Sequence, residues 1–417
     1  MTKNSIQGKG CRFKREPMGI LPSIVLELDE LRSEYKAKRK EALAEHGLKS
    51  SEYRKWDTAQ LGVKRMRASL YGITGATNFG WYEKRIAENI THAGREALMK
   101  IVEKAEEWGF KVYYGDTDSI FVGVGDDLAP EEAGKVADKL GRDLTAYMQA
   151  DLETYANTDS ISVETEAVLD RMVMSTKKRY AGRYVWKPDT GTKIMEADAD
   201  SRLKVTGLKM KQRKTPQIGK DAEKSAMMDI FDGKPIHTVL DNFKEYAIQL
   251  RKDYHDGKIP LESLCGRASL RKSIPKPENV NRIAPAIAKK HLHYTFGSST
   301  EGVSKITYLS ALQDFHKAAA WYNIHLSDDN YPPIEQDDSF YTVYVKDGPT
   351  WIPSTGMVAF QEVEQISDYE IDIDKVIDKN LFASMDSILT AFGYDKSVLD
   401  ANKVRFTVEG YLGEIGK

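Results

Sequence analysis

The chain has 417 residues, of which 41% are hydrophobic, and its formal net charge at pH 7 is -2. A chain of this length exceeds what one compact core accommodates, so we expect it to divide into two or three units. It contains no apolar run long enough to span a membrane and no apolar segment near Met1 of the kind found in secretion signals, so neither class is expected. Cys11 and Cys265 lie far apart and lack metal-ligand spacing, which argues against a disulfide scaffold and a zinc site.

Two charged helices are predicted in the first part of the chain. Apolar residues recur at helical spacing from residue 22 to about residue 45, and a second helix is expected over 51–71, after a break at His46-Gly47. Two such helices predict a protruding antiparallel hairpin.

One face of each predicted helix carries cations. On the second helix, residues at i, i+3, i+4 and i+7 share a face, namely Lys64, Arg67, Ala68 and Tyr71. On the first helix, Arg32 and Lys36 are i, i+4 neighbours. Cations that converge from two helices suit a triphosphate, with Arg gripping two oxygens and Lys acting as a point charge. The alternative interpretation is ordinary surface lysine and arginine.

A third helix is expected over residues 82–108, and it leads into the segment K-V-Y-Y-G-D-T-D-S-I-F-V-G at 111–123. Its two strand-forming runs are separated by a reversal short enough to place Asp116 and Asp118 at the tip of a hairpin. Two close carboxylates repel each other unless a cation lies between them, and oxygen ligands suit Mg²⁺ or Mn²⁺. The alternative is a simple turn, because Asp and Gly dominate turns for conformational reasons.

Beyond the hairpin, strands are predicted over 162–169, 172–175 and 180–186, with Glu164 and Glu166 on a common face of the first. From about residue 206 the chain is expected to be mainly helical, with a small strand-rich insert near 340–345 and 357–362.

Charge is distributed unevenly along the chain. Residues 171–220 contain fourteen Lys and Arg against four acids, whereas residues 328–374 contain twelve acids and one base, Lys346. A basic segment close to a carboxylate hairpin favours a polyanionic ligand, with the acidic segment turned away from it. The alternative is that each charge run is only a solvated face.

The order of these motifs resembles that of family B DNA polymerases, as found in archaea and T-even-like phages. The most specific matches are Y-G-D-T-D-S at 114–119 and K-K-R-Y at 177–180, and K-x6-Y-G at 64–72 accompanies them. G-I-L-P-S at 19–23 resembles the start of the first fingers helix, and G-L-K-M-K-Q-R-K-T-P at 207–216 resembles the crossing from palm to thumb. Beyond about residue 221 the resemblance rests on pattern alone.

The resemblance implies an α+β fold with the right-hand polymerase architecture. Its parts would be an N-terminal palm remnant at 1–18, helical-hairpin fingers at 19–72, an incomplete antiparallel-sheet palm at 73–205 and a mainly helical thumb at 206–417. The implied activity is template-directed DNA synthesis, in which a primer 3′-OH attacks a dNTP with the help of two Mg²⁺ ions, or Mn²⁺ in their place. The protein would then be cytoplasmic, in the host cytoplasm if its source is viral.

The resemblance also implies roles for individual residues. Asp118 would bind both catalytic metals with Asp116 as a supporting carboxylate, and Glu166 matches a further acid near the metals, though a plain surface glutamate is the alternative. The nucleotide-binding residues would be Lys64, Arg32 and Lys36, with Tyr71 and Ala68 near the nascent pair. The DNA-binding residues would be Thr117, Tyr114, Lys177, Lys178, Arg179, Tyr180, Lys209, Lys211, Arg213 and Lys214.

The sequence departs from the family pattern in two ways. Ala68 stands where the family usually has Asn, which removes a polar contact near the nucleotide. The strand D-x-x-S-L-Y-P, which carries the family's other metal-binding Asp, is missing, as are the N-terminal and exonuclease domains. Two-metal catalysis needs carboxylates from both sides. We therefore expect the C-terminal subunit of a split polymerase, whose partner chain carries the missing palm strand and the exonuclease; a sliding clamp is a further partner that the family allows.

Other interpretations stay open at this point. The chain is alternatively a non-catalytic DNA-binding subunit or an inactive truncated fragment, although Asp116, Asp118 and Lys64 have no purpose in pure binding. A metal site at His291 and His293, in K-H-L-H-Y, is a third interpretation with little support, because H-x-H without further ligands is usually surface or packing.

Overall fold

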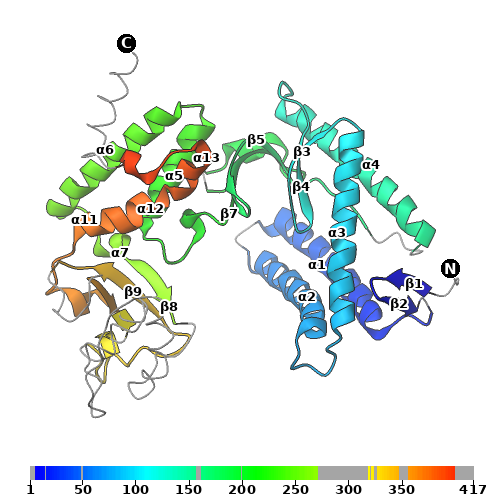
Figure 1. Cartoon of the computed structure of the whole chain (residues 1–417), viewed down its shortest axis with the longest axis horizontal. Helices are drawn as coiled ribbons and strands as arrows, with labels where there is room; N and C mark the ends of the chain where they lie inside the picture. Colours follow the sequence, from blue (N-terminus) through cyan, green and yellow to red (C-terminus); the bar gives the residue numbers. More distant parts are fainter. Residues whose placement is uncertain are drawn as a thin grey trace. The chain divides into compact units, whose positions relative to one another are not determined.

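The computed structural model describes residues 5–14, 16–47, 50–155, 161–198, 200–270, 318–319, 321–323, 326–346 and 356–399, so His291 and His293 lie outside the described residues. The chain divides into two compact units: a first unit of Met1–Val168 and Trp186–Lys193, and a second of Leu169–Val185 and Ile194–Lys417. The mixed helix and sheet composition is as expected (Figure 1). The finer division into fingers, palm and thumb stays a prediction.

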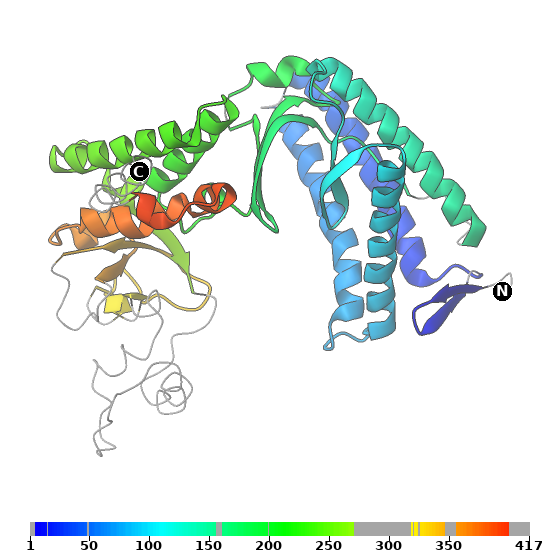
Figure 2. The same cartoon turned by 45° about the horizontal axis from the view of Figure 1, so that its top comes forward.

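The predicted helical hairpin is present in the first unit. It consists of α1 (Ile20–His46) and α2 (Ser51–Gly75), which lie side by side in Figure 2. The connection turns at Gly47, whose φ of 77° is one that glycine adopts readily, and Ser50 then caps α2 by accepting a hydrogen bond from the Tyr53 backbone N–H at 3.1 Å. Across the hairpin the rings of Tyr35 and Trp56 are 5.6 Å apart. These contacts hold two highly charged helices together.

Helices α3 (Lys84–Glu107) and α4 (Pro130–Tyr155) pack against the predicted carboxylate hairpin, which is formed by β3 (Lys111–Asp116) and β4 (Ser119–Gly123). Their shared core is made of Ile101, Ala105, Leu140, Leu144 and Met148, against which Val112, Ile120 and Val122 of the hairpin pack. The third helix was predicted correctly, whereas α4 was not predicted. The hairpin therefore rests on a helical layer.

A small N-terminal hairpin is fastened to α3 by one side chain. Strands β1 (Ser5–Gly8) and β2 (Cys11–Lys14) pair antiparallel. Asn89 of α3 accepts a hydrogen bond from the Lys9 backbone N–H at 2.6 Å and donates to the Lys9 carbonyl at 3.2 Å. Because both backbone groups of Lys9 are satisfied by one amide, this segment is held in the first unit.

The strand predicted over 162–169 is wrong for most of its length, because residues 161–167 form no regular secondary structure. Their backbone bonds go to side chains of α4: the Val163 N–H donates to the Thr145 hydroxyl at 2.8 Å, and the Gln149 amide donates to the Ile161 carbonyl at 3.1 Å. Burial still alternates along the segment, and Glu164 and Glu166 are both exposed.

Helix α4 approaches Trp186 so closely that only glycine fits at Gly134. A Cβ atom at this position would lie 2.5 Å from Cε2 of the Trp186 ring, and Trp186 is buried. Gly134→Ala is therefore expected to lower the free energy of unfolding by about 1 to 3 kcal/mol through overpacking. Urea unfolding of the full chain measures it, with Gly94→Ala as the control.

Gly94 lies inside α3, and a Cβ atom there would meet nothing within 4 Å. Alanine at this position should stabilise the helix by about 0.5 to 1 kcal/mol. Equal effects of the two substitutions would contradict the close packing of α4 on Trp186.

The second unit begins with a three-stranded sheet in the order β5-β6-β7, formed by β5 (Val168–Thr176), β6 (Arg179–Trp186) and β7 (Leu203–Thr206). Tyr180 of β6 pairs with Thr206 of β7, and Arg183 pairs with Leu203. A short helix η2 (Lys209–Lys211) follows, and then the helices α5 (Gln217–Phe231) and α6 (Ile236–His255). The predicted segments 172–175 and 180–186 correspond to β5 and β6.

The rest of the second unit is a small sheet with short helices. The sheet has the order β10-β9-β8, from β8 (Gly266–Ser269), β9 (Ser339–Tyr344) and β10 (Met357–Phe360), which agrees with the predicted strand-rich insert. The short helices are η1 (Thr192–Glu196), α7 (Leu261–Leu264), η4 (Val363–Ile366), α11 (Ile373–Val376), η5 (Ile377–Leu381), α12 (Phe382–Ser384), α13 (Asp386–Phe392) and η6 (Lys396–Leu399). Over the part of the chain that the structure describes, no helix is both long and apolar enough to cross a membrane.

Candidate functional site

The carboxylate hairpin ends in a very tight turn. Asp116 pairs with Ser119, so only Thr117 and Asp118 form the reversal. Thr117 has a φ of 59°, and the Asp118 backbone N–H donates to the Asp116 carbonyl at 2.7 Å, which is the bond of a γ-turn. Positive φ is uncommon for a residue such as threonine, and outliers of this kind cluster at functional sites.

The two acids at the tip differ in their exposure to solvent. Asp118 and Thr117 are exposed, whereas Asp116 is half-buried and accepts a hydrogen bond from the Thr117 hydroxyl at 3.0 Å. Tyr114 is half-buried beside Phe121, with 6.1 Å between ring centroids. Asp118 is thus the acid best placed to meet a ligand, with Asp116 behind it.

The carboxylates of the two acids at the tip are suitable ligands for a hard divalent cation, but two residues alone do not complete a metal site. Carboxylate oxygens are the ligands that Mg²⁺ and Mn²⁺ prefer. Among the described residues, no three His, Cys, Asp or Glu side chains gather into a group that could hold a metal ion. Glu166 lies outside any strand and is exposed, and its place near the metals stays a prediction.

The cationic faces of α1 and α2 are neighbours. Asp29 pairs with Arg67, and Arg39 pairs with Asp57 at 3.0 Å. In each pair the two residue numbers add to the same total, as antiparallel helices require, and the numbers of Arg32 and Lys64 add to it as well. Arg32 and Lys64 therefore lie at the same level of the hairpin.

The side chains on these faces are largely open to solvent. Lys64, Lys36 and Ala68 are exposed, and Tyr71 is 45% exposed. Arg32 is half-buried, and within the described part of the chain its Nε atom is buried without a hydrogen-bond partner. A buried donor without a partner calls for a physical explanation, such as a bound water or ion. Arg67, which the sequence grouped with Lys64, is instead engaged by Asp29.

In the second unit, K-K-R-Y forms the turn from β5 into β6. Lys177, Lys178 and Arg179 are exposed, whereas Tyr180 is only 5% exposed, so its ring is not presented for the predicted DNA contact. Lys178 has a φ of 61°. Its carbonyl would lie 2.0 Å from a Cβ atom at Gly207, whose own φ is 68°, so the turn abuts the start of the G-L-K-M-K segment.

The two basic groups of the second unit are therefore linked by the β6–β7 ladder. Lys211, Arg213 and Lys214 are exposed. Lys209 differs, because its ammonium donates to the Ala383 carbonyl and pairs with Asp386 at 2.7 Å. The prediction that Lys209 meets the primer strand is not supported by these contacts, which give it a structural role.

A buried acid holds η2 in place. Glu223 of α5 is fully buried, and its carboxylate accepts a hydrogen bond from the Met210 backbone N–H at 2.5 Å. Burial raises the pKa of Glu223 to about 7, against the smaller lowering effects of the backbone N–H groups of Met210 and Lys209. Sequence reasoning missed Glu223, and its only signal was an acid on the apolar face of a predicted helix.

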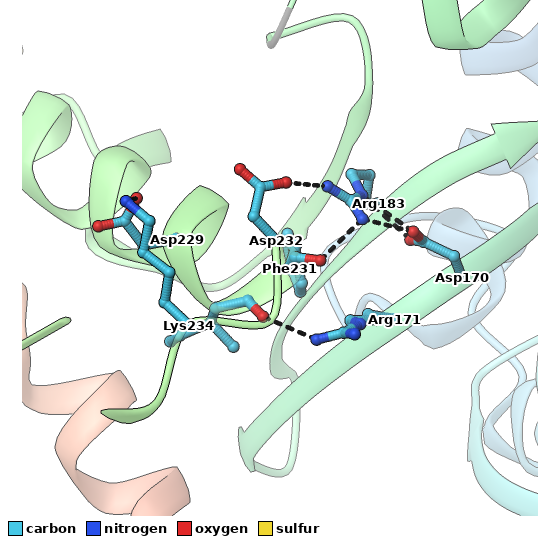
Figure 3. A network of polar contacts seen from close by, with 8 residues as sticks. Asp170, Arg171, Arg183, Asp229, Phe231, Asp232 and Lys234 are labelled. Carbon is cyan, nitrogen blue, oxygen red and sulfur yellow. Dashed lines mark hydrogen bonds and ion pairs between the residues drawn. The ribbon is translucent and has the colours of Figure 1, made fainter. Parts of the chain in front are cut away.

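Sequence reasoning also missed Arg183. This residue of β6 binds Asp170 of β5 and Asp232, which follows α5, in the network of Figure 3. A cation inside the otherwise apolar strand Y-A-G-R-Y-V-W was the available signal.

Comparisons with known proteins identify related sequences. Residues 2–333 match the family described as DNA polymerase family B. A DNA polymerase of Archaeoglobus fulgidus is 26% identical over 391 residues, which cover 94% of this chain and 42% of that protein. The DNA polymerase alpha catalytic subunit of Mus musculus is 23% identical over 289 residues, or 69% of this chain and 18% of that protein.

Among solved structures, the family B DNA polymerase of Pyrobaculum calidifontis matches with 21% identity and a TM-score of 0.47, covering 92% of this chain and 40% of that one. The chain thus spans less than half the length of each of these relatives.

Proposed function

The chain belongs to DNA polymerase family B, and from this membership we propose that it carries out template-directed DNA synthesis, in which a nucleotide passes from a dNTP to a primer 3′-OH. The observation that carries the proposal is the β3–β4 hairpin, whose two-residue turn exposes Asp118 with Asp116 beside it. Pure DNA binding has no use for acids at a site that must meet phosphates.

Asp118 and Asp116 would hold Mg²⁺ or Mn²⁺, which when bound lowers the pKa of the primer hydroxyl and stabilises the departing pyrophosphate. Thr117 keeps the Asp116 carboxylate oriented through its hydroxyl. The tight turn limits the freedom of both acids, which favours a preorganised site. Glu166 is an exposed acid with no assigned part in this group.

Lys64, Arg32 and Lys36 would bind the triphosphate. Two observations support this role. The register of α1 against α2 places Arg32 level with Lys64, and the Nε atom of Arg32 has no hydrogen-bond partner within the described residues. Tyr71 and Ala68, on the same face of α2 as Lys64, would lie near the nascent base pair. Motion of the hairpin onto the nucleotide would exclude water from the phosphates.

The exposed cations of the second unit would hold the primer–template duplex. They form two groups joined by the β6–β7 ladder. The first is Lys177 to Arg179 at the turn, and the second is Lys211, the last residue of η2, with Arg213 and Lys214 after it. Contacts of this kind go to phosphates and are independent of base sequence. Tyr180 would support the turn from within, since it is buried.

We further propose that a second polypeptide completes the active site. The chain spans 42% of the length of the Archaeoglobus fulgidus DNA polymerase that it matches, and the β3–β4 hairpin supplies carboxylates from one side only. The partner would be an N-terminal polymerase chain with the missing palm strand and the exonuclease. Two-metal chemistry requires its additional carboxylate.

The nucleotide-binding proposal is tested by Lys64→Met in a primer-extension assay with the partner chain present. Loss of one point charge on the phosphates should raise the KM for dNTP roughly 10- to 100-fold, the effect of one charge-assisted contact. Lys40→Met, which removes an exposed lysine elsewhere on the helical hairpin, should leave the KM unchanged. If both variants behave alike, Lys64 does not bind the nucleotide.

A further inference from the structure

Arg183 connects three separate segments of the second unit. Its Nε and Nη2 atoms donate to the Asp170 carboxylate, with a shortest distance of 2.6 Å. Its Nη1 atom donates to Asp232 at 2.5 Å, and Nη2 also donates to the Phe231 carbonyl at 2.7 Å (Figure 3). The Arg183 side chain is only 13% exposed, so it is not available to a ligand at the surface.

The acceptors at Phe231 and Asp232 belong to the C-terminal end of α5. The last carbonyls of a helix have no partner within it and carry the negative end of its dipole, so they attract cations. A second arginine uses the same end: Arg171 of β5 donates to the Ile230 carbonyl at 3.2 Å, and Figure 3 shows its guanidinium directed toward that turn. Two arginines from neighbouring strands therefore fasten the sheet to one helix end.

The bridges lie beside an apolar core that the sheet and α5 share. Val173 and Ala181 of the sheet belong to the same buried cluster as Met227 and Phe231 of α5. A surface cleft of about 550 Å³ lies between residues 171–173 of β5 and the α5–α6 turn, with Phe392 on its wall. The guanidinium bridges therefore add directional contacts to the apolar packing where the end of α5 meets the sheet.

Arg183 joins the sheet, which carries one group of proposed DNA contacts, to the end of α5, the helix that holds the segment with the other group. The sheet carries Lys177 and Lys178 at the β5–β6 turn, and α5 holds η2 through the bond from Met210 to Glu223. Lys211 is the last residue of η2, and Arg213 lies two residues further along the chain. A change in the angle between sheet and helix would therefore alter the spacing of the two basic groups.

We propose that Arg183, which bridges Asp170 and Asp232, is a positioning residue for the proposed DNA-binding surface. It sets the distance between the two basic groups and thereby the residence time of the duplex. Arg183 touches neither DNA nor nucleotide. The inference rests on the proposed function, since it presumes that these groups bind DNA.

The test is Arg183→Lys in the full chain, with a fluorescent primer–template duplex whose dissociation is followed after rapid mixing with competitor DNA. Lysine keeps the charge but cannot reach Asp170, Asp232 and the Phe231 carbonyl together. We expect dissociation to be about tenfold faster, the factor that corresponds to one charge-assisted hydrogen bond. Asp232→Asn, which weakens only the helix side of the bridge, should shift the rate in the same direction.

Two readouts separate positioning from other roles. Because Arg183 makes no phosphate contact, the slope of log affinity against log salt should stay unchanged in Arg183→Lys, whereas Lys178→Ala should lower that slope by about one. The matched control is Arg251→Lys, an exposed arginine that pairs with Asp374 at 2.7 Å in the same unit, and it should alter neither quantity.

The proposal is overturned if folded Arg183→Lys and Asp232→Asn release DNA at the wild-type rate while Lys178→Ala weakens binding. A lower salt slope in Arg183→Lys would also overturn it, because it would make Arg183 a direct phosphate contact. If Lys178→Ala leaves DNA binding unchanged as well, the DNA interface itself is wrong, and the role of Arg183 fails with it.

Discussion

Replacing Asp118 with alanine is expected to slow primer extension by at least about a thousandfold, because the proposed site has few carboxylates and each one holds catalytic charge in place. The fold should survive the change. The turn is closed by the Asp118 backbone N–H, which bonds the Asp116 carbonyl at 2.7 Å and remains in the alanine variant. The measurement is single-nucleotide incorporation in the presence of the partner chain, with DNA affinity recorded in parallel.

Asp126→Ala is the matched control, because Asp126 is an exposed acid in the loop just after β4. It should extend primers at the wild-type rate. DNA affinity should be similar in all three proteins, since lysine and arginine contacts determine it. If Asp118→Ala and Asp126→Ala extend equally well, the catalytic assignment is wrong and a non-catalytic DNA-binding subunit becomes the better interpretation.

Glu223→Gln is expected to stabilise the protein at pH 8 and to have little effect at pH 4.5. Burial raises the pKa of Glu223 from 4.5 to about 7, so the folded state binds the proton more tightly than the unfolded state. The stability from this group is fully present below pH 4.5 and is lost as the pH rises through 7. This shift in pKa corresponds to at most about 3 kcal/mol in the free energy of unfolding. Glutamine does not ionise, so the variant does not lose this stability at high pH.

Thermal unfolding of wild type and Glu223→Gln at both pH values measures this difference. Lys209 and Asp386 are the charged groups that act on Glu223 from the neighbouring segments, and their effects on its pKa have opposite signs. Glu245→Gln, at an exposed position on α6, should show no dependence of this kind. An equal stability difference at pH 4.5 and pH 8 would mean that Glu223 is not an acid buried in the folded state.

Local patterns predicted the elements to which the proposed chemistry is assigned. The helical hairpin follows from apolar spacing and the His46-Gly47 break, and the acid-tipped β-hairpin follows from two strand-forming runs around Gly-Asp-Thr-Asp. Both features depend on residues close in sequence, so a linear pattern contains the information. The cationic faces of α1 and α2 follow from helical spacing for the same reason.

Most of the failures concern contacts between separate elements, whereas helix α4 was missed although its pattern is local. Residues 161–167 alternate as a strand does, yet their backbone bonds go to Thr145 and Gln149 of a helix that was not foreseen. In the sequence Lys209 is one basic residue among several, but its ammonium donates a hydrogen bond to Asp386, which lies 177 positions away along the chain. Arg183 likewise depends on Asp232. Sequence spacing carries no information on such contacts.

The central claim is that this chain supplies one wall of a shared catalytic site, and reconstitution tests it most directly. Single-nucleotide incorporation is measured for this chain alone, for a separately expressed N-terminal chain ending in the D-x-x-S-L-Y-P strand, and for their mixture with Asp118 or Ala at position 118. We predict incorporation only by the mixture that retains Asp118. Incorporation by this chain alone, or by the Asp118→Ala mixture at an undiminished rate, would contradict the account.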